Sequence, residues 1–220
     1  MIYEKEIRGK KFFLREETLD EYVAKESCYR DVNFDENDIW LDIGANIGIF
    51  PIYYCDKVKQ IISFEAEPEN FSLFKRNIEL NNVKNCYIYN CAVVWDDRKE
   101  TSFYLNTKKN KGSHSMLIKG GRDEITVNCL NINDIIETHK PNKLKIDIEG
   151  GEYELIKSIK NWNNIKELIF EYHINVLRDS EGKKLEELYE IFRNNGFEIN
   201  GKKSNELGKN WQIIVHCKKP

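Results

Sequence analysis

The stretch from Asp38 to Phe50 constrains the fold of this chain more than any other. It opens with an apolar, β-prone segment from Ile39 to Ile43, breaks at a turn that carries Gly44 and Gly48, and resumes as an apolar pattern with helical spacing. Glycines at such a turn let the backbone bend sharply and let a ligand approach closely. The stretch therefore predicts the first strand, turn and helix of a nucleotide-binding βα unit, with turn amides facing a ligand above the helix N-terminus.

The spacing of this turn differs from the dinucleotide fingerprint. G-x-G-x-x-G would place glycines at positions 44, 46 and 49, but the chain has Gly44, Asn46 and Ile49. The spacing present, D-x-G-A-N-x-G, resembles motif I of class I S-adenosylmethionine-dependent methyltransferases. On that resemblance the candidate cofactor-binding residues are Asp42, Gly44, Asn46 and Gly48. A tight turn in some other α/β protein is the alternative.

Strand and helix patterns alternate along the rest of the chain, which indicates a parallel sheet covered by helices on both faces. Further strands are expected at 58–64, 86–94, 101–105, 124–129, 144–148 and 168–172, and helices at 68–81, 153–159 and 182–194. A closing hairpin of 197–199 and 211–215 fits a seven-stranded methyltransferase sheet, whose last strand is antiparallel. The predicted fold is thus α/β, a Rossmann-like class I methyltransferase with a mostly parallel seven-stranded sheet.

The first 37 residues are expected to form a preface to this fold. Strands at 2–7 and 11–14 flank the turn Arg8-Gly9-Lys10, and Thr18 opens a capping box for a helix over 19–29. A lid and an edge addition are the two roles open to it. We therefore divide the chain into an N-terminal hairpin and helix, residues 1–37, and a methyltransferase domain, residues 38–220.

Composition limits the partners and the location of the protein. The net charge of -3 gives no basic excess of the kind that nucleic-acid binding requires. No apolar run approaches the length of a membrane span, and the N-terminus is charged rather than apolar. Six cysteines at irregular spacings, without C-x-x-C, indicate reduced thiols. We expect a cytoplasmic protein without a membrane span or a nucleic-acid partner, and the oligomeric state stays open.

Acidic and amide residues at predicted strand ends are candidate ligands as well. Glu65 ends the second strand, 21 positions after Gly44, where a carboxylate can accept both hydrogen bonds from a ribose diol. Asn90 lies near the end of the next strand. Because ligands bind at the carboxyl ends of parallel strands, Asp42, Glu65, Asn90 and Asp147 are expected to converge. A solvated acid is the alternative reading of Glu65.

The run from Lys145 to Glu152 places charges on a strand that should be central. Residues two apart share a face of a strand, so Lys145, Asp147 and Glu149 are expected to lie on one face. Charges on a central strand are costly to bury without partners, which favours a functional role over a solvated edge. Glu171 and His173 repeat this spacing on the next strand and should lie near Asp147.

These five residues, Lys145, Asp147, Glu149, Glu171 and His173, are the candidate catalytic group. Two carboxylates and an imidazole that converge can hold a base in place or bind Mg²⁺ or Mn²⁺, so metal ligation stays open. A hydrogen-bonded structural role for His173 is an equal alternative. The long polar loop 106–123, which contains His114, favours a lid or substrate loop.

Taken together, the motifs resemble the FkbM-type S-adenosylmethionine-dependent methyltransferases. The motifs that carry the resemblance are D-I-G-A-N-I-G, the F-E-A-E-P of residues 64–68, and K-I-D-I-E-G-G-E, together with the single residues Asn77 and Asn81. The chain departs at Ala66, usually proline, and at Ile132-Asn133-Asp134, usually Leu-Asp-Asp. The resemblance implies S-adenosylmethionine as cofactor and O-methyl transfer, often onto a sugar hydroxyl of a glycan or glycoconjugate.

The chemistry of such an acceptor agrees with the acidic group. A sugar hydroxyl is a poor nucleophile at neutral pH and needs a base, or a metal that lowers its pKa. Asp147 is the candidate for either role, as the general base or as a ligand of the metal. A nicotinamide-dependent oxidoreductase is disfavoured by the missing middle glycine. A non-catalytic sugar-nucleotide or glycan-binding module is disfavoured because buried charges without a function tend not to be stabilising.

Overall fold

The computed structural model describes residues 1–26, 32–106, 109–179, 182–203 and 212–220. Its strands are β1 (Ile2–Ile7), β2 (Lys10–Arg15), β3 (Ile39–Ile43), β4 (Gln60–Phe64), β5 (Cys86–Tyr89), β6 (Ala92–Val94), β7 (Glu100–Leu105), β8 (Asp123–Asn131), β9 (Lys143–Ile146), β10 (Glu167–His173), β11 (Glu198–Lys203) and β12 (Gln212–Lys218). Its helices are α1 (Asp20–Lys25), α2 (Ile49–Tyr54), α3 (Pro68–Leu80), α4 (Ile132–His139), α5 (Glu152–Lys157), α6 (Ile174–Leu177) and α7 (Lys183–Asn194), with a 3₁₀ turn at Cys55–Lys57.

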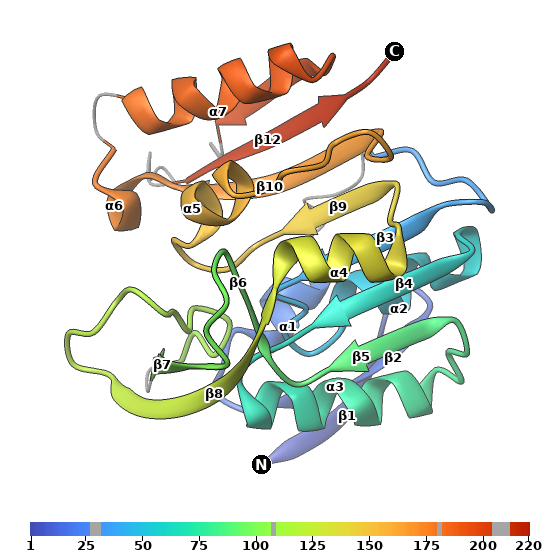
Figure 1. The fold of residues 1–220 in the computed structure, drawn as a ribbon. Coiled ribbons are helices and arrows are strands. Elements are labelled where there is room, and N and C mark those ends of the chain that lie inside the picture. The colour runs from blue at the N-terminus through green and yellow to red at the C-terminus, as the bar shows by residue number, and fades with distance from the viewer. Residues whose placement is uncertain (27–31, 107–108, 180–181, 204–211) are drawn as a thin grey trace.

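Seven strands form one central sheet in the order β11-β12-β10-β9-β3-β4-β5 (Figure 1). Only β12 pairs antiparallel with its neighbours in this sheet, and the remaining pairs are parallel. From β3 the chain proceeds to β4 and β5 on one side, and it returns to β9 and β10 on the other. This arrangement confirms the predicted class I methyltransferase sheet, and it creates a switch point between β3 and β9.

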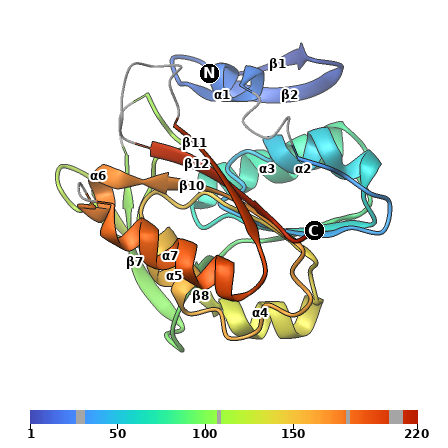
Figure 2. The same ribbon diagram turned by 90° about the horizontal axis from the view of Figure 1, so that it is seen from above.

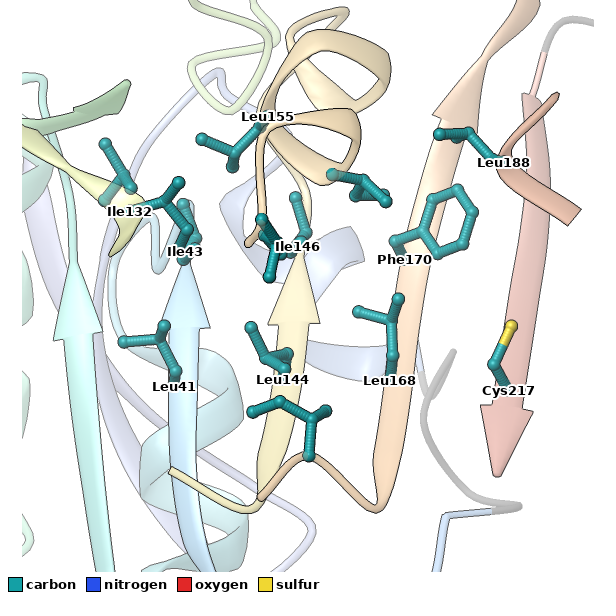
Figure 3. Close-up of a cluster of buried hydrophobic side chains, with 14 of the residues drawn as sticks. Leu41, Ile43, Ile132, Leu144, Ile146, Leu155, Leu168, Phe170, Leu188 and Cys217 are labelled. Carbon is teal, nitrogen blue, oxygen red and sulfur yellow. The ribbon is translucent and has the colours of Figure 1, made fainter. Parts of the chain in front are cut away.

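Helices cover both faces of the sheet (Figure 2). α4, α5 and α7 lie on one face, and α2 and α3 lie on the other, beneath the hairpin β1–β2 and α1. The first face holds the main core, to which alternate residues of the central strands contribute, such as Leu41 and Ile43 of β3 and Leu144 and Ile146 of β9. Figure 3 shows these side chains pointing to the same side as Leu155 of α5. None of the helices among the described residues is long and apolar enough to cross a bilayer.

The N-terminal hairpin packs on the helices of the second face. Phe12 and Leu14 are fully buried, in a cluster with Ile47, Ile52 and Leu73. Two amide side chains of α3 and its C-cap also bond to the β2 backbone: the Phe13 amide donates to Asn77 Oδ1 over 2.7 Å, and Asn81 pairs with the Lys11 backbone in both directions. The hairpin is therefore fixed against the sheet domain by both apolar and polar contacts.

Three of the predicted elements differ in the structure. The strand expected at 86–94 is two strands, because Asn90 and Cys91 turn the chain out of the main sheet and β6 then pairs with β8. The strand expected at 144–148 ends at Ile146. The helix expected at 19–29 starts at Asp20, whose amide donates to Thr18 Oγ1 over 3.2 Å, and ends at Lys25. Glu26 has an extended backbone. Residues 27–29 of that helix and residue 211 of the closing hairpin lie outside the described residues.

Strands β6, β8 and β7 form a separate three-stranded sheet beside the main one. β7 and β8 are antiparallel, and residues 109–122 between them are anchored back on β7 by an isolated bridge between Tyr104 and Ser115. The long polar loop of the sequence therefore extends from the end of a β-hairpin, and its later part returns toward the carboxyl ends of the main strands.

Candidate functional site

A cavity of about 290 Å³ lies at the switch point, at the carboxyl ends of β3, β4 and β9. Its walls come from four parts of the chain: the turn after β3, the strand ends, the N-terminal region and the loop after β7. Residues that line it include Gly44, Asn46, Glu65, Lys145, Asp147, Glu149, Glu171, Tyr22 and His114. The volume is near the lower end of the range for small-molecule sites.

The two glycines of the turn are required by the close approach of other residues. Both have positive φ, +83° at Gly44 and +88° at Gly48. A Cβ on Gly44 would lie 1.8 Å from the Asp147 carbonyl oxygen, and one on Gly48 would lie 2.1 Å from the Phe74 ring. Gly44 thus allows the backbone of Asp147 to lie directly against the turn, where its amide donates to the Ile43 carbonyl over 2.9 Å.

The amides of this turn do not face the cavity freely, contrary to the sequence prediction. The Gly44 and Ala45 amides both donate to the Phe64 carbonyl over 3.0 Å, and the Gly48 amide donates to Ala45. These bonds fix the turn to the end of β4. The turn therefore shapes the wall, and side chains supply most of its polar groups.

Glu65 is a buried acid held in place by two backbone amides. Its Oε2 accepts from the Asn46 amide over 2.7 Å, and its Oε1 accepts from the Glu67 amide over 2.9 Å. Burial raises the pKa of Glu65 to about 7, although both amides oppose the shift. Each carboxylate oxygen keeps a further lone pair for a ligand in the cavity.

Asp42 lies behind the cavity and pairs with Lys145. Asp42 is fully buried, its Oδ1 lies 3.0 Å from Lys145 Nζ, and its Oδ2 accepts from Ser63 Oγ over 3.0 Å. Lys145 also donates to the Gly44 carbonyl over 2.7 Å. Burial lowers the pKa of Lys145, but the charges of Asp42 and Asp147 outweigh burial and leave it raised. The pair therefore joins the two central strands beneath the turn.

Asn90 is placed away from the cavity wall. Its side chain is exposed, and its Nδ2 donates to the backbone carbonyls of Glu65 and Ala66 over 2.9 and 3.2 Å. The structure thus brings three of the four predicted strand-end residues to the switch point, and Asn90 contacts the cavity only through the backbone that it holds.

Asp147, Glu171 and His173 converge as the sequence predicts. One potential ligand atom from each lies within 4.8 Å of the others. Asp147 follows β9, while Glu171 and His173 lie on the neighbouring β10, where Gln212 of β12 bonds to Glu171. Burial and the charge of Asp147 hold the pKa of Glu171 well above its usual value. Glu171 is therefore protonated more readily than a free glutamate is.

Glu149 does not share a strand face with Lys145 and Asp147. The strand has ended, and Glu149 has a positive φ of 55°, so its side chain enters the site from a turn. Its Oε2 lies 3.4 Å from His173 Nε2. Burial raises the pKa of Glu149 to about 7. The residue does reach the predicted group, but by a different backbone route.

Sequence reasoning did not single out Glu152, which orients His173. Glu152 is fully buried, and its Oε1 lies 2.7 Å from His173 Nδ1 and accepts from the Gly150 amide over 3.0 Å. Burial lowers the pKa of His173, but the Glu152 carboxylate outweighs it and leaves the pKa well above 6.5. The sequence signal that could have identified Glu152 is its position directly after Gly150 and Gly151, at the start of a helix.

A second ion cluster lies at the opposite, amino end of the strands. Lys143 pairs with Asp38 over 2.9 Å and with Glu167 over 2.6 Å, and Glu167 lies 2.6 Å from His216 Nε2. His216 thus has a structural environment remote from the cavity. The remaining histidine, His139, packs edge-on against the Tyr89 ring.

The loop after β7 is fixed at several points beside the cavity. Its Lys109 carbonyl accepts from the Leu19 amide over 3.0 Å, its Lys111 carbonyl accepts from Asn70 over 2.9 Å, and Ser115 Oγ donates to the Glu149 carbonyl over 2.7 Å. The loop therefore lies between the N-terminal region and the turn that carries Glu149, and His114 becomes part of the cavity wall.

The strand order of the sheet, the glycine turn after β3 and the acid Glu65 after β4 define an S-adenosylmethionine-dependent methyltransferase of class I. Residues 42–199 match the family model described as the Methyltransferase FkbM domain. The chain belongs to this family. Membership confirms the resemblance found in the sequence, and it decides against the nicotinamide-dependent oxidoreductase and the non-catalytic binding module.

Two relatives of known name share about a quarter of the sequence. Methyltransferase 1 of Beauveria bassiana is 27% identical over an alignment of 191 positions, which covers 74% of this chain and 75% of that protein. Hexuronic acid methyltransferase AglP of Haloferax volcanii is 26% identical over an alignment of 179 positions, which covers 78% of this chain and 73% of that protein.

Solved structures share the fold. Methyltransferase FkbM from Methylobacillus flagellatus KT superimposes with a TM-score of 0.56 at 14% identity, over 86% of this chain and 46% of that one. M. jannaschii TYW2 in complex with AdoMet gives a TM-score of 0.52 at 14% identity, over 99% of this chain and 85% of that one. At these identities the likeness is one of fold.

Proposed function

We propose that this protein transfers a methyl group from S-adenosylmethionine to a hydroxyl group of a sugar in a glycan or glycoconjugate. The observation that carries the proposal is the meeting of Asp147, Glu171 and His173 beside the cavity that the glycine turn and Glu65 also line. The sugar acceptor is supported by the likeness to a relative named as a hexuronic acid methyltransferase. Free thiols at Cys55, Cys86, Cys91, Cys129 and Cys217 support the accompanying inference of a cytoplasmic location.

The wall of the cavity fits the cofactor. Glu65 offers the open lone pairs of a fixed carboxylate to ribose hydroxyls, and Phe64, Ala92 and Val93 provide an apolar surface for a base. Two buried polar atoms of cavity residues, Asn46 Oδ1 and His114 Nε2, have no hydrogen-bond partner within the described parts of the chain. When bound, S-adenosylmethionine supplies a methyl group that its sulfonium has already activated. Asp42 supports this wall from behind through Lys145.

Asp147 is the residue assigned to the acceptor. Its backbone lies against Gly44, so its side chain starts beside the cofactor wall and faces the acidic group on β10. In this position it accepts the proton of the acceptor hydroxyl as general base. Lys145 adds a positive charge beneath it, and Glu149, Glu171 and His173 surround it.

A divalent cation is a second use of the same group. Two carboxylates and an imidazole within 4.8 Å of one another match the ligand types of Mn²⁺ or Mg²⁺, and the imidazole favours Mn²⁺. The contact of His173 Nδ1 with Glu152 supports this use, because histidines that ligate a metal usually bond to a carboxylate through the other ring nitrogen. The cation would lower the pKa of the acceptor hydroxyl and orient it.

Methyl transfer to defined acceptors tests the function. The purified protein is incubated with methyl-labelled S-adenosylmethionine and with a panel of neutral and acidic glycosides, before and after exhaustive chelation. Label incorporated into a glycoside hydroxyl supports the proposal, and the absence of label from every glycoside, in a protein that binds S-adenosylmethionine, contradicts it. Activity that survives chelation removes the cation and leaves the proton-transfer role of Asp147.

A further inference from the structure

A backbone hydrogen bond fixes the tautomer of His114. The Asn106 amide donates to His114 Nδ1 over 2.8 Å. A backbone amide can only donate, so Nδ1 acts as the acceptor and carries no proton. In the neutral ring the single proton is therefore on Nε2. Burial, with the charges of Lys111, Arg122 and Arg15, lowers the pKa of His114 to about 4, so the ring is neutral at physiological pH.

The Nε2–H group is a buried donor on a ring that lines the cavity. His114 is 6% exposed, and Nε2 has no hydrogen-bond partner in the part of the chain that the structure describes. A buried donor without an acceptor costs free energy, and such groups are rare in folded proteins. A ligand that places an acceptor at this point of the wall would satisfy the donor.

The charges around His114 favour a negatively charged acceptor. The charged groups that act most on the ring are the cations Lys111, Arg122 and Arg15, of which Arg15 is paired with Asp20 over 2.9 Å. Arg122 is fixed to the loop itself, since its guanidinium donates to the carbonyls of Ser113 and Tyr104. A neutral donor beside these cations can donate to an anion without adding a further charge to the buried wall.

We propose that His114 is a ligand-binding residue whose Nε2–H donates to a carboxylate oxygen of the bound ligand. The carboxylate belongs either to the amino-acid part of the cofactor or to an acidic sugar acceptor. The inference rests on the proposed function and adds a residue that selects for this group. Gly112 of the same loop lies next to the side chain of Asn46. The loop that carries the His114 donor is therefore close to the glycine turn.

Two substitutions separate this role from the structural role of the ring. His114→Asn keeps an acceptor near the position of Nδ1 for the Asn106 amide but removes the Nε2–H donor. His114→Gln keeps a donor near Nε2 but lacks the Nδ1 acceptor. His139→Asn is the matched control, because His139 lies outside the cavity wall. Thermal unfolding without ligand reports the folding of each variant.

Calorimetry with three probes identifies the ligand group. S-adenosylhomocysteine carries the amino-acid carboxylate, 5′-methylthioadenosine lacks it, and glucuronate is added to the protein saturated with S-adenosylhomocysteine. For a cofactor carboxylate, His114→Asn weakens S-adenosylhomocysteine about tenfold or more and leaves 5′-methylthioadenosine unchanged. For an acceptor carboxylate, only glucuronate binding is lost. In both cases His114→Gln stays within about threefold of the wild type.

Three results overturn the inference. They are affinities of His114→Asn equal to wild type for every probe, equal losses in His114→Asn and His114→Gln, and an equal loss for 5′-methylthioadenosine and S-adenosylhomocysteine. Failure of the wild-type protein to bind S-adenosylhomocysteine is a different result, because it contradicts the proposed function itself.

Discussion

Asp147 is the residue on which the chemistry depends most directly. Asp147→Asn keeps the size of the side chain and removes its charge and most of its basicity. Turnover should fall by about 10²–10⁴, the usual range for a lost general base. Cofactor affinity should hardly change, because the assigned role is toward the acceptor. Kinetics at saturating cofactor measure the first effect, and calorimetry measures the second. Weak cofactor binding with near-normal turnover would contradict the assignment, because it would show that Asp147 acts on the cofactor and not on the acceptor.

The buried pair of Asp42 and Lys145 makes a prediction about stability. Lys145→Met leaves the fully buried Asp42 without its cation, so the free energy of unfolding should fall by about 3–5 kcal/mol. The double variant Asp42→Leu with Lys145→Met should recover a large part of the loss, since no fully buried carboxylate is then left at position 42 without its cation. Urea unfolding measures both. A double variant that is less stable than Lys145→Met would show that the pair is not the source of the effect.

At the scale of elements, the loop after β7 is the segment whose order should depend on ligand. Its contacts with Leu19, Asn70 and Glu149 are single hydrogen bonds. Cofactor and acceptor together should therefore protect the amides of residues 109–122 against hydrogen exchange, with little change in the core strands. Equal exchange with and without both ligands would contradict a lid.

Most elements of this fold could be predicted from the sequence, because their patterns are local. The alternation of lysine and apolar residues in β9, the apolar run Leu168-Ile169-Phe170 in β10 and the helical spacing in α3 and α7 are visible in the chain itself. The break after Tyr89 was not predictable in this way. Both β5 and β6 are apolar, and only the pairing of β6 with the distant β8 shows that they belong to different sheets.

The site divides in the same manner. Gly44, Glu65 and Asp147 were predictable, because strand-end positions in a parallel sheet meet at one edge. The function of Glu152 and the cavity wall from Tyr22 and His114 were not. They depend on contacts between segments that lie far apart in the chain, and no local spacing encodes those contacts.

At the scale of the whole molecule, Glu65 should make stability depend on pH. Its pKa is about 7 in the folded protein, above the 4.5 of an exposed glutamate. The folded state therefore binds more protons than the unfolded state between these values, so its contribution is fully present below pH 4.5 and is lost as pH rises through 7. Between pH 4.5 and pH 7, ionisation of Glu65 should lower the free energy of unfolding of the ligand-free protein by about 3 kcal/mol.

Glu65→Gln tests this dependence, because the amide does not titrate. Unfolding free energies from pH 5 to pH 8 should decline less steeply in the variant than in the wild type. Identical slopes in the two proteins would mean that Glu65 is ionised over the whole range and that burial does not control its charge.

Binding of S-adenosylhomocysteine by the wild type and by Glu65→Ala tests the central claim most directly, that the cofactor occupies the cavity between the glycine turn and Glu65. Loss of the carboxylate removes bonds to the ribose, so binding should weaken by about 1.5–3 kcal/mol, the range for hydrogen bonds to a charged group. Glu79→Ala, at an exposed position of α3, is the matched control and should bind as the wild type does. Unchanged affinity in a folded Glu65→Ala protein, measured by calorimetry, would contradict the account.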